Sequence, residues 1–167
     1  MASALATADH SAATRDLAAL AGKYLTFALA AEGYGLPVLK VREIIKMLYI
    51  TGVPQAPQHV KGVINLRGKV IPVVDLRLRF GFPSQAYGER TCIIVTEVAL
   101  QSSTVMMGVV VDAVSEVLTI AADEIEATPD FGGHVNTEFM MGVAKTKGRV
   151  KFLLELDRIF GGDGSQC

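Results

Sequence analysis

Few residues of this chain have the types and spacing that catalysis requires. The three histidines, His10, His59 and His134, have no cysteine or carboxylate neighbours at the spacing of metal ligands. Residues 62–69 resemble a phosphate-binding loop, but five residues instead of four separate the glycines, and Val70 stands where a serine or threonine would bind magnesium. The Gly-x-Ser-x-Gly motif of a nucleophilic serine is absent. The sequence therefore favours a protein without a catalytic, metal or cofactor site.

The chemistry that remains is recognition, and its residues lie in one apolar stretch, residues 62–81. A polar set interrupts this stretch: Asn65, Arg67, Lys69, Arg77 and Arg79. An arginine guanidinium can form two parallel hydrogen bonds to a carboxylate, which a lysine ammonium cannot do with the same geometry. The rim of this segment is therefore a predicted docking surface for another protein.

The elements that position these side chains can be predicted from the same stretch. Two apolar runs, residues 63–66 and 69–74, flank Gly68, which can take the positive φ of a tight hairpin turn. Pro72 cannot donate a ladder hydrogen bond, so the second strand is expected at a sheet edge or at a bulge. Asp75 is expected to cap a helical turn that ends at Gly81.

The same layout recurs 80 positions later, in residues 141–161. Three glycines of the first stretch fall on glycines of the second, and the turn cations Arg67 and Lys69 fall on Lys147 and Arg149. A second correspondence, with a shift of 73, aligns Gly35, Val41, Glu43 and Ile44 with Gly108, Val114, Glu116 and Val117. Glycine-marked hairpins could recur by chance, but the shared register favours two related units.

The remaining segments predict a mainly β chain. Residues 23–29 alternate like a half-buried strand, with Leu25 and Phe27 on one face, and residues 91–98 and 105–111 read as core strands. Pro37 suits the first position of a helix, and the apolar residues between 38 and 48 keep helical spacing. We therefore expect one short helix between strands in the first unit.

Composition limits the class of protein. The chain has 167 residues, 50% of them hydrophobic, which is enough for one packed body. Seventeen acidic and 16 basic residues give a net charge of −1, which disfavours nucleic acid and anionic lipid as partners. The chain has no apolar run of membrane-spanning length. Its two cysteines, Cys92 and Cys167, fit a reducing cytosol.

The predicted organisation is a single domain between two tails. Residues 1–21 are expected to be disordered or weakly helical, and residues 162–167 to form a flexible tail. Between them, residues 22–161 divide into one subdomain of about 22–84 and another of about 85–161, and exchange of strands between the two is left open. Each unit alone is small, so the two are expected to share an apolar interface.

Three segments carry a resemblance to a known family. Residues 34–44, 62–81 and 107–118, with the NLRG and DLR elements that begin at Asn65 and Asp75, are similar to the CheW-like family of chemotaxis coupling proteins. The resemblance implies a mainly β fold of two SH3-like five-stranded β-barrel subdomains packed together with short helices. It also implies a non-enzymatic cytoplasmic adaptor in chemoreceptor arrays, which bridges the tips of methyl-accepting chemoreceptors and the regulatory domain of the histidine kinase CheA.

The resemblance also implies two contact sites. The residues that match the family's receptor-contacting groove are Val41, Glu43, Gly62, Val63, Asn65 and Arg67. Arg67 is the strongest candidate, and Glu43 could orient it through an ion pair. Two plainer interpretations stay open: the pair could be an ordinary surface ion pair, and Val41 could belong to the core.

On the kinase side, the resemblance points to Phe131. An aromatic anchor contributes much of the binding energy of a small interface, although a loop aromatic could equally fold over its own barrel. Glu126 departs from the family pattern, in which some members have a basic residue near this place.

Two other functions remain open at this stage. One is coupling in a different chemosensory kinase pathway, such as surface motility or biofilm control. The other is a small-barrel protein that binds a ligand or nucleic acid, but 7% aromatic residues, no tryptophan and a balanced charge speak against it.

Overall fold

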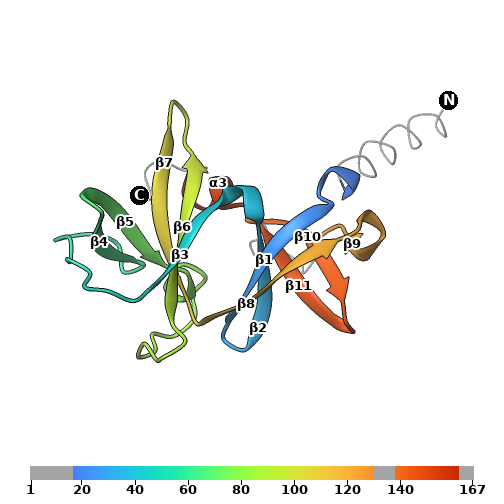
Figure 1. Cartoon of the computed structure of the whole chain (residues 1–167), viewed down its shortest axis with the longest axis horizontal. Helices are drawn as coiled ribbons and strands as arrows, with labels where there is room; N and C mark the ends of the chain where they lie inside the picture. The colour runs from blue at the N-terminus through green and yellow to red at the C-terminus, as the bar shows by residue number, and fades with distance from the viewer. Residues whose placement is uncertain (1–16, 130–137, 162–167) are drawn as a thin grey trace.

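The computed structural model describes residues 17–129 and 138–161 (Figure 1). The elements, in chain order, are β1 (Gly22–Leu29), β2 (Glu32–Pro37), η1 (Val38–Lys40), β3 (Val41–Lys46), β4 (Val60–Leu66), β5 (Lys69–Asp75), α2 (Leu76–Arg79), β6 (Cys92–Ala99), β7 (Thr104–Val111), β8 (Ala113–Ile120), η2 (Ala122–Glu124), β9 (Ile125–Glu126), β10 (Met140–Thr146), β11 (Arg149–Leu154) and α3 (Leu156–Gly161).

The strands form two sheets, as a mainly β fold of two barrels predicts. One has the strand order β8-β1-β2-β11-β10-β9 and the other β3-β6-β7-β5-β4. Figure 1 shows the two sheets as separate bodies side by side, with β3 and β8 running between them. The first sheet has six strands rather than five because the two-residue strand β9 pairs with the edge of β10.

The strands β3 and β8 change places between the sheets. β3 follows β2 in the chain but pairs with β6, and β8 follows β7 but pairs with β1. The hairpins β4–β5 and β10–β11 are exchanged in the same way. β5 of the first half pairs with β7 of the second half, and β11 of the second half pairs with β2 of the first. Each sheet therefore takes strands from both halves of the chain.

The predicted repeat is confirmed in the backbone. In β4–β5 the register shifts between Val60 and Gly62, and in β10–β11 it shifts between Met140 and Gly142, 80 positions later. The turns match as well: Arg67 and Gly68 have φ of 51° and 87°, and Lys147 and Gly148 have 54° and 75°. Two consecutive positive φ angles are typical of the type I′ turn, whose twist suits a hairpin.

Three apolar clusters hold the sheets together. The largest lies between the two bodies and joins Phe27 and Leu36 of the six-stranded sheet to Val74 and Ile94 of the five-stranded sheet. Each sheet also encloses a smaller cluster of its own. This shared core confirms that the two units have an apolar interface.

Strand β1 is buried on both faces, so the prediction of a half-buried strand was wrong. Leu25 and Phe27 pack into the shared core, while Tyr24, on the other face, packs into the cluster of the six-stranded sheet. Thr26 is also buried, and its Oγ1 donates a hydrogen bond to the carbonyl oxygen of Glu116 (2.7 Å). The partners on both sides of β1 come from distant parts of the chain, so the local pattern did not reveal them.

The predicted helix over residues 38–48 was also wrong. Only the 3-10 turn η1 forms, and residues 41–46 are the strand β3, in which half-buried and exposed side chains alternate. Apolar residues at 41, 44, 45 and 48 fit a helix, but Val41, Ile44 and Ile45 are β-branched and favour a strand that can pair. β6 provides that partner, with Ile44 opposite Ile94.

The hairpin β4–β5 and the helix α2 follow the prediction, with one exception. Asp75 caps α2 by accepting a hydrogen bond from the amide of Arg77 (2.9 Å), and Gly81 follows with φ of 84°. Pro72, however, does not lie in an edge strand, because β5 is flanked by β4 and β7. The ladder to β7 begins only at Val73, so the proline is accommodated in the part of β5 that pairs with β4 alone.

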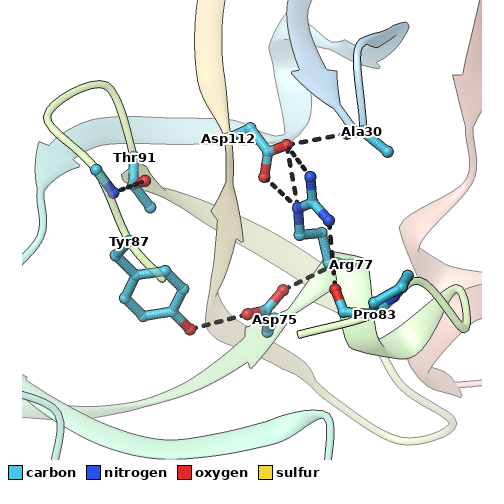
Figure 2. Close-up of polar contacts among 8 residues, drawn as sticks. Ala30, Asp75, Arg77, Pro83, Tyr87, Thr91 and Asp112 are labelled. Atoms are coloured by element: carbon cyan, nitrogen blue, oxygen red, sulfur yellow. Dashed lines mark hydrogen bonds and ion pairs between the residues drawn. The ribbon is translucent and has the colours of Figure 1, made fainter. Parts of the chain in front are cut away.

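Arg77 and Arg79, two of the arginines in the predicted docking rim, bond to distant parts of the chain. Arg77 Nε and Nη2 donate to the two carboxylate oxygens of Asp112 (2.8 and 2.9 Å), and Asp112 also accepts from the amide of Ala30 (2.9 Å; Figure 2). Arg79 donates to the carbonyl oxygen of Ile159 in α3 (3.0 Å). Both arginines therefore tie the hairpin to distant segments.

Each of the two segments that cross between the sheets is held by an ion pair. At one crossing the segment supplies the carboxylate, and at the other it supplies the cation. Asp112 lies between β7 and β8, where the chain passes to the other sheet, and its cation comes from α2. Lys40 lies between β2 and β3 and pairs with Asp157 of α3 (3.0 Å). Asp157 also accepts from the amide of Ala99 (2.8 Å), as Asp112 does from Ala30. Each crossing is thus fixed by one carboxylate that bonds a cation and a hairpin amide.

Some predicted segments fall outside the described residues. These are residues 1–16, residues 162–167 and Phe131. Of the predicted N-terminal tail, Leu17 and Leu20 are described, and both pack against the cluster of the six-stranded sheet.

Candidate functional site

The six residues expected in a receptor-contacting groove lie on β3, on β4 and in the turn after β4. We call this region the β3–β4 edge: Val41, Glu43, Gly62, Val63, Asn65 and Arg67. β3 and β4 are at opposite ends of the strand order, so in a flat sheet they would be far apart. Instead the sheet curls until Arg67 Nη2 donates to Glu43 Oε1 (2.8 Å). The structure thus brings Glu43 and Arg67 together as the sequence predicted.

The connector after β3 completes this closure. Thr51 and Val63 exchange two backbone hydrogen bonds, each 2.8 Å long. The next residue back along β4, Gly62, has φ of 142°, and a Cβ there would lie 1.9 Å from the carbonyl oxygen of Thr51. No side chain fits in that space, so a glycine is needed there for β4 and the connector to approach this closely.

Asn65 also acts within the chain. Its Oδ1 accepts a hydrogen bond from the amide of Gly68 (2.9 Å), which stabilises the turn. The left-handed conformation of Arg67 in that turn leaves 70% of its side chain exposed, whereas 28% of the Glu43 side chain is exposed. The turn therefore presents a guanidinium at the surface and keeps its carboxylate partner partly covered.

The ion pair keeps both groups charged. The hydrogen bond from Arg67 holds the pKa of the Glu43 carboxyl below its usual value, and partial burial opposes this shift. The same contact raises the pKa of Arg67. In the described part of the chain, only Nη2 of Arg67 makes these bonds, so Nε and Nη1 can donate to a partner's carboxylate or carbonyl oxygens.

The two valines of the β3–β4 edge are placed differently from the charged pair. Val41 is half-buried, pairs with Thr96 of β6 and packs against the shared core. Val63 is also half-buried and faces the connector through its bonds to Thr51. Val41 therefore has the packing that the core interpretation predicted, while Glu43 and Arg67 supply the polar surface of the site.

Four exposed apolar side chains on the strand and connector that lead away from Glu43 were missed in the sequence. They are Ile44, Leu48, Tyr49 and Val53, on β3 and the connector; Tyr49 is 83% exposed and Ile44 is 45% exposed. Assigning residues 38–48 to a helix put Ile44 and Leu48 on its buried face. Strand alternation from Val41 would have placed Ile44 outside. Exposed apolar and aromatic side chains are common in protein-binding surfaces.

The described residues contain neither a metal-binding cluster nor a membrane-spanning helix. Within residues 17–129 and 138–161, no three histidine, cysteine or acidic side chains come together in a way that could hold a metal ion. In the same residues, no helix is both long and apolar enough to cross a bilayer.

Comparison with known proteins places the chain in a family. The family described as "CheW-like domain" matches residues 23–163. A chemotaxis protein CheW from Klebsiella aerogenes is 34% identical over 84% of this chain and 82% of its own length, and one from Rhizobium meliloti is 37% identical over 81% and 85%. The protein FrzA from Myxococcus xanthus is 33% identical over 68% of each chain.

A solved structure agrees with these relatives. The scaffolding protein TtCheW from Thermoanaerobacter tengcongensis superposes with a TM-score of 0.77 at 36% identity, covering 89% of this chain and 98% of its own. The family match spans the residues that form both sheets. The chain is therefore a member of the CheW-like domain family.

Proposed function

We propose that this protein is a chemotaxis adaptor that couples methyl-accepting chemoreceptors to the histidine kinase CheA. The observation that carries the proposal is the β3–β4 edge, where Glu43 orients the exposed guanidinium of Arg67. The family membership and the names of the relatives support the same role. Receptor tips would hold the protein in membrane-associated arrays on their cytoplasmic side.

The receptor would bind at the β3–β4 edge. Arg67 donates its remaining hydrogen bonds to carboxylate or carbonyl oxygens of the receptor tip, and the exposed Tyr49 and Ile44 cover apolar receptor side chains. Gly62 and Asn65 preserve the shape of the edge, and Val63 anchors its connector. Val41 contributes by packing β3 on the core.

The kinase would bind elsewhere, with Phe131 as an aromatic anchor. Phe131 lies outside the described residues, so its part of the proposal rests on the family resemblance alone. Separate sites allow the adaptor to hold receptor and kinase at once, which raises the effective concentration of one near the other. Control of the kinase also requires that the bound receptor favours one kinase state, since equal binding to both would transmit nothing.

A reconstituted system tests this proposal. A receptor cytoplasmic fragment and CheA are mixed with the parent protein or with Arg67→Ala, and kinase autophosphorylation and receptor binding are followed. We expect about a tenfold loss of receptor affinity and a matching loss of receptor-dependent kinase activity at limiting adaptor. Lys147→Ala, at the corresponding turn of the repeat, is the matched control and should behave like the parent.

The kinase site is tested separately. Phe131→Ala should weaken binding to CheA and leave binding to the receptor fragment unchanged. Equal kinase stimulation by the parent and by Arg67→Ala would rule out Arg67, and weakened receptor binding by Phe131→Ala would contradict two separate sites.

A second candidate is coupling in a different chemosensory pathway. It is favoured by one observation, the similarity to a relative that carries another name, the protein FrzA. Purified receptors and kinases of each pathway encoded beside the gene would distinguish the two, because only the cognate set should be activated.

A further inference from the structure

The parallel pairing of β5 with β7 begins later along the strands than the pairing of β11 with β2, their equivalents in the repeat. β5 and β7 pair in parallel from Val73, opposite Gly108, to Asp75. The preceding residues of β5, Ile71 and Pro72, have no partner in β7, although β7 begins at Thr104. Figure 1 shows the two strands diverging from their common point. We call the resulting opening, bounded by residues 69–72 and 104–107, the β5–β7 notch.

The corresponding place in the six-stranded sheet is closed. There β11 and β2 begin to pair two residues earlier, through three pairs: Lys151–Gly33, Phe152–Tyr34 and Leu153–Gly35. By the two shifts of the repeat, the last of these is the equivalent of Val73–Gly108. The rings of Phe152 and Tyr34 are 5.8 Å apart, and Lys151 covers Gly33.

The substitutions along the repeat explain the difference. Pro72 stands in the place of Phe152, and a proline has no amide hydrogen to donate to a neighbouring strand. Met106 and Met107 stand in the places of Gly33 and Tyr34, so no glycine allows the close approach that Gly33 gives to Lys151. The five-stranded sheet therefore lacks both the strand pairing and the aromatic ring that fill this position in its counterpart.

The notch is an open hollow at the surface with mainly apolar walls. Its volume is about 540 Å³, and Val70, Pro72, Leu100, Met106 and Met107 are among its lining residues. Val70 is 71% exposed, although it is β-branched and lies in a strand. Lys69 is the one charged residue of the lining, and it stands at the end nearest the turn.

We propose that the β5–β7 notch receives an aromatic side chain of a partner protein, on a segment with an acidic residue beside the aromatic one. The repeat identifies the occupant, because the equivalent position in the other sheet is filled by the ring of Phe152. Methionine thioethers make favourable contacts with aromatic rings, and the ammonium of Lys69 complements a carboxylate.

This site is distinct from the β3–β4 edge. The two lie along different strands of one hairpin, since β4 carries the receptor candidates and β5 forms one wall of the notch. The inference therefore does not rest on the proposed function, and receptor binding through Arg67 can fail without affecting it.

The test uses the full chain labelled with ¹³C at the methionine methyls, and the blocked peptide acetyl-Val-Glu-Phe-Val-amide as the probe. A site of this size should bind such a peptide with a Kd on the order of 1 mM. The aromatic ring should then shift the methyl signals of Met106 and Met107 upfield, while those of Met47 and Met140 stay in place. A peptide with alanine instead of phenylalanine should produce no such shift.

Three variants make the result specific. Pro72→Phe fills the notch with the residue of the repeat and should weaken peptide binding about tenfold. Lys69→Glu should weaken binding of the acidic peptide but not of its glutamine counterpart. Arg149→Glu, at the matching position of the other hairpin, should leave binding unchanged.

The amide spectrum of each variant establishes that it is folded. The proposal is overturned if saturating peptide leaves Met106 and Met107 unshifted. It is equally overturned if folded Pro72→Phe binds as tightly as the parent, because the peptide would then bind elsewhere.

Discussion

The hairpins β4–β5 and β10–β11 share a bulge and a turn type but differ in chemistry. Both have a bulge at the same glycine and a left-handed turn, and in each an acidic residue of β3 or β8 pairs with a cation in that turn. The first pair is Glu43–Arg67 and the second is Glu116–Lys147, with a longer contact of 3.3 Å. The shared features are those that close a barrel, whereas the differing side chains are those that a partner would meet.

The junctions between the sheets show a second kind of divergence. Arg77–Asp112 and Lys40–Asp157 fix the two crossings in the same way, but the cation and the carboxylate have exchanged places. A position that only has to hold two segments together can accept either polarity. A position that recognises a partner cannot accept either polarity, so substitutions at the two kinds of position should have different effects.

The largest expected effect concerns the two bulge glycines. Gly62→Ala should reduce the free energy of unfolding by about 3–5 kcal/mol, because about 1–3 kcal/mol of backbone strain adds to the clash with Thr51. Gly142→Ala should cost about 1 kcal/mol, since its Cβ would lie 3.0 Å from the carbonyl oxygen of Glu126. Urea unfolding of both variants measures the difference. Equal losses would show that the two bulges are equally tight.

The next effect concerns the crossings. Asp112→Ala should cost about 2–3 kcal/mol, because the Arg77 side chain, only 13% exposed, loses its partner and the amide of Ala30 loses its acceptor. Asp157→Ala should cost about 1 kcal/mol, since 33% of the Lys40 side chain is exposed and can be hydrated. Urea unfolding again provides the measurement. A larger loss for Asp157→Ala would reverse this ranking.

A smaller effect concerns recognition by the two turns. Arg67→Lys should lower receptor affinity about threefold to tenfold, because an ammonium cannot replace the fork of hydrogen bonds of a guanidinium. The reciprocal variant Lys147→Arg should leave receptor affinity unchanged. Titration of a receptor cytoplasmic fragment by calorimetry compares the two. If Lys147→Arg gains affinity, the second turn also contacts the receptor.

The smallest effect concerns the pH dependence of stability. Glu43 has a lowered pKa in the folded protein, so its ion pair stabilises the fold above the pKa of the unfolded chain, about 4.5, and loses this contribution as pH falls through the folded pKa. Glu43→Gln should therefore be less stable than the parent at pH 7 and approach it in acid. Urea unfolding between pH 7 and pH 3 measures both. A constant difference across this range would contradict the role of the Glu43 charge.

The hairpin could be predicted from sequence because its signals are local. Gly68 indicates a turn and Asp75 indicates a helix cap from the local sequence alone, and the structure confirms both. The region around Ile44 could not be read in this way, because its apolar spacing fits a helix and a strand equally. The choice depended on the partner strand β6, about 50 residues away.

The same reason limited the prediction of the candidate site. The pairing of Glu43 with Arg67 was predicted from the family resemblance and is confirmed, whereas their role in receptor binding stays a prediction. Arg77 and Arg67 looked alike in the sequence, but one is tied to Asp112 and the other faces solvent. Which arginine stays exposed depends on contacts between segments distant in the chain, and local pattern does not encode them.

The exchange of β3 and β8 has a consequence for how this protein can change. A chain cut between its two related halves would leave each half with the hairpin of one barrel and the central strands of the other. Neither half would therefore contain a complete barrel, and each sheet can close only when both halves are present.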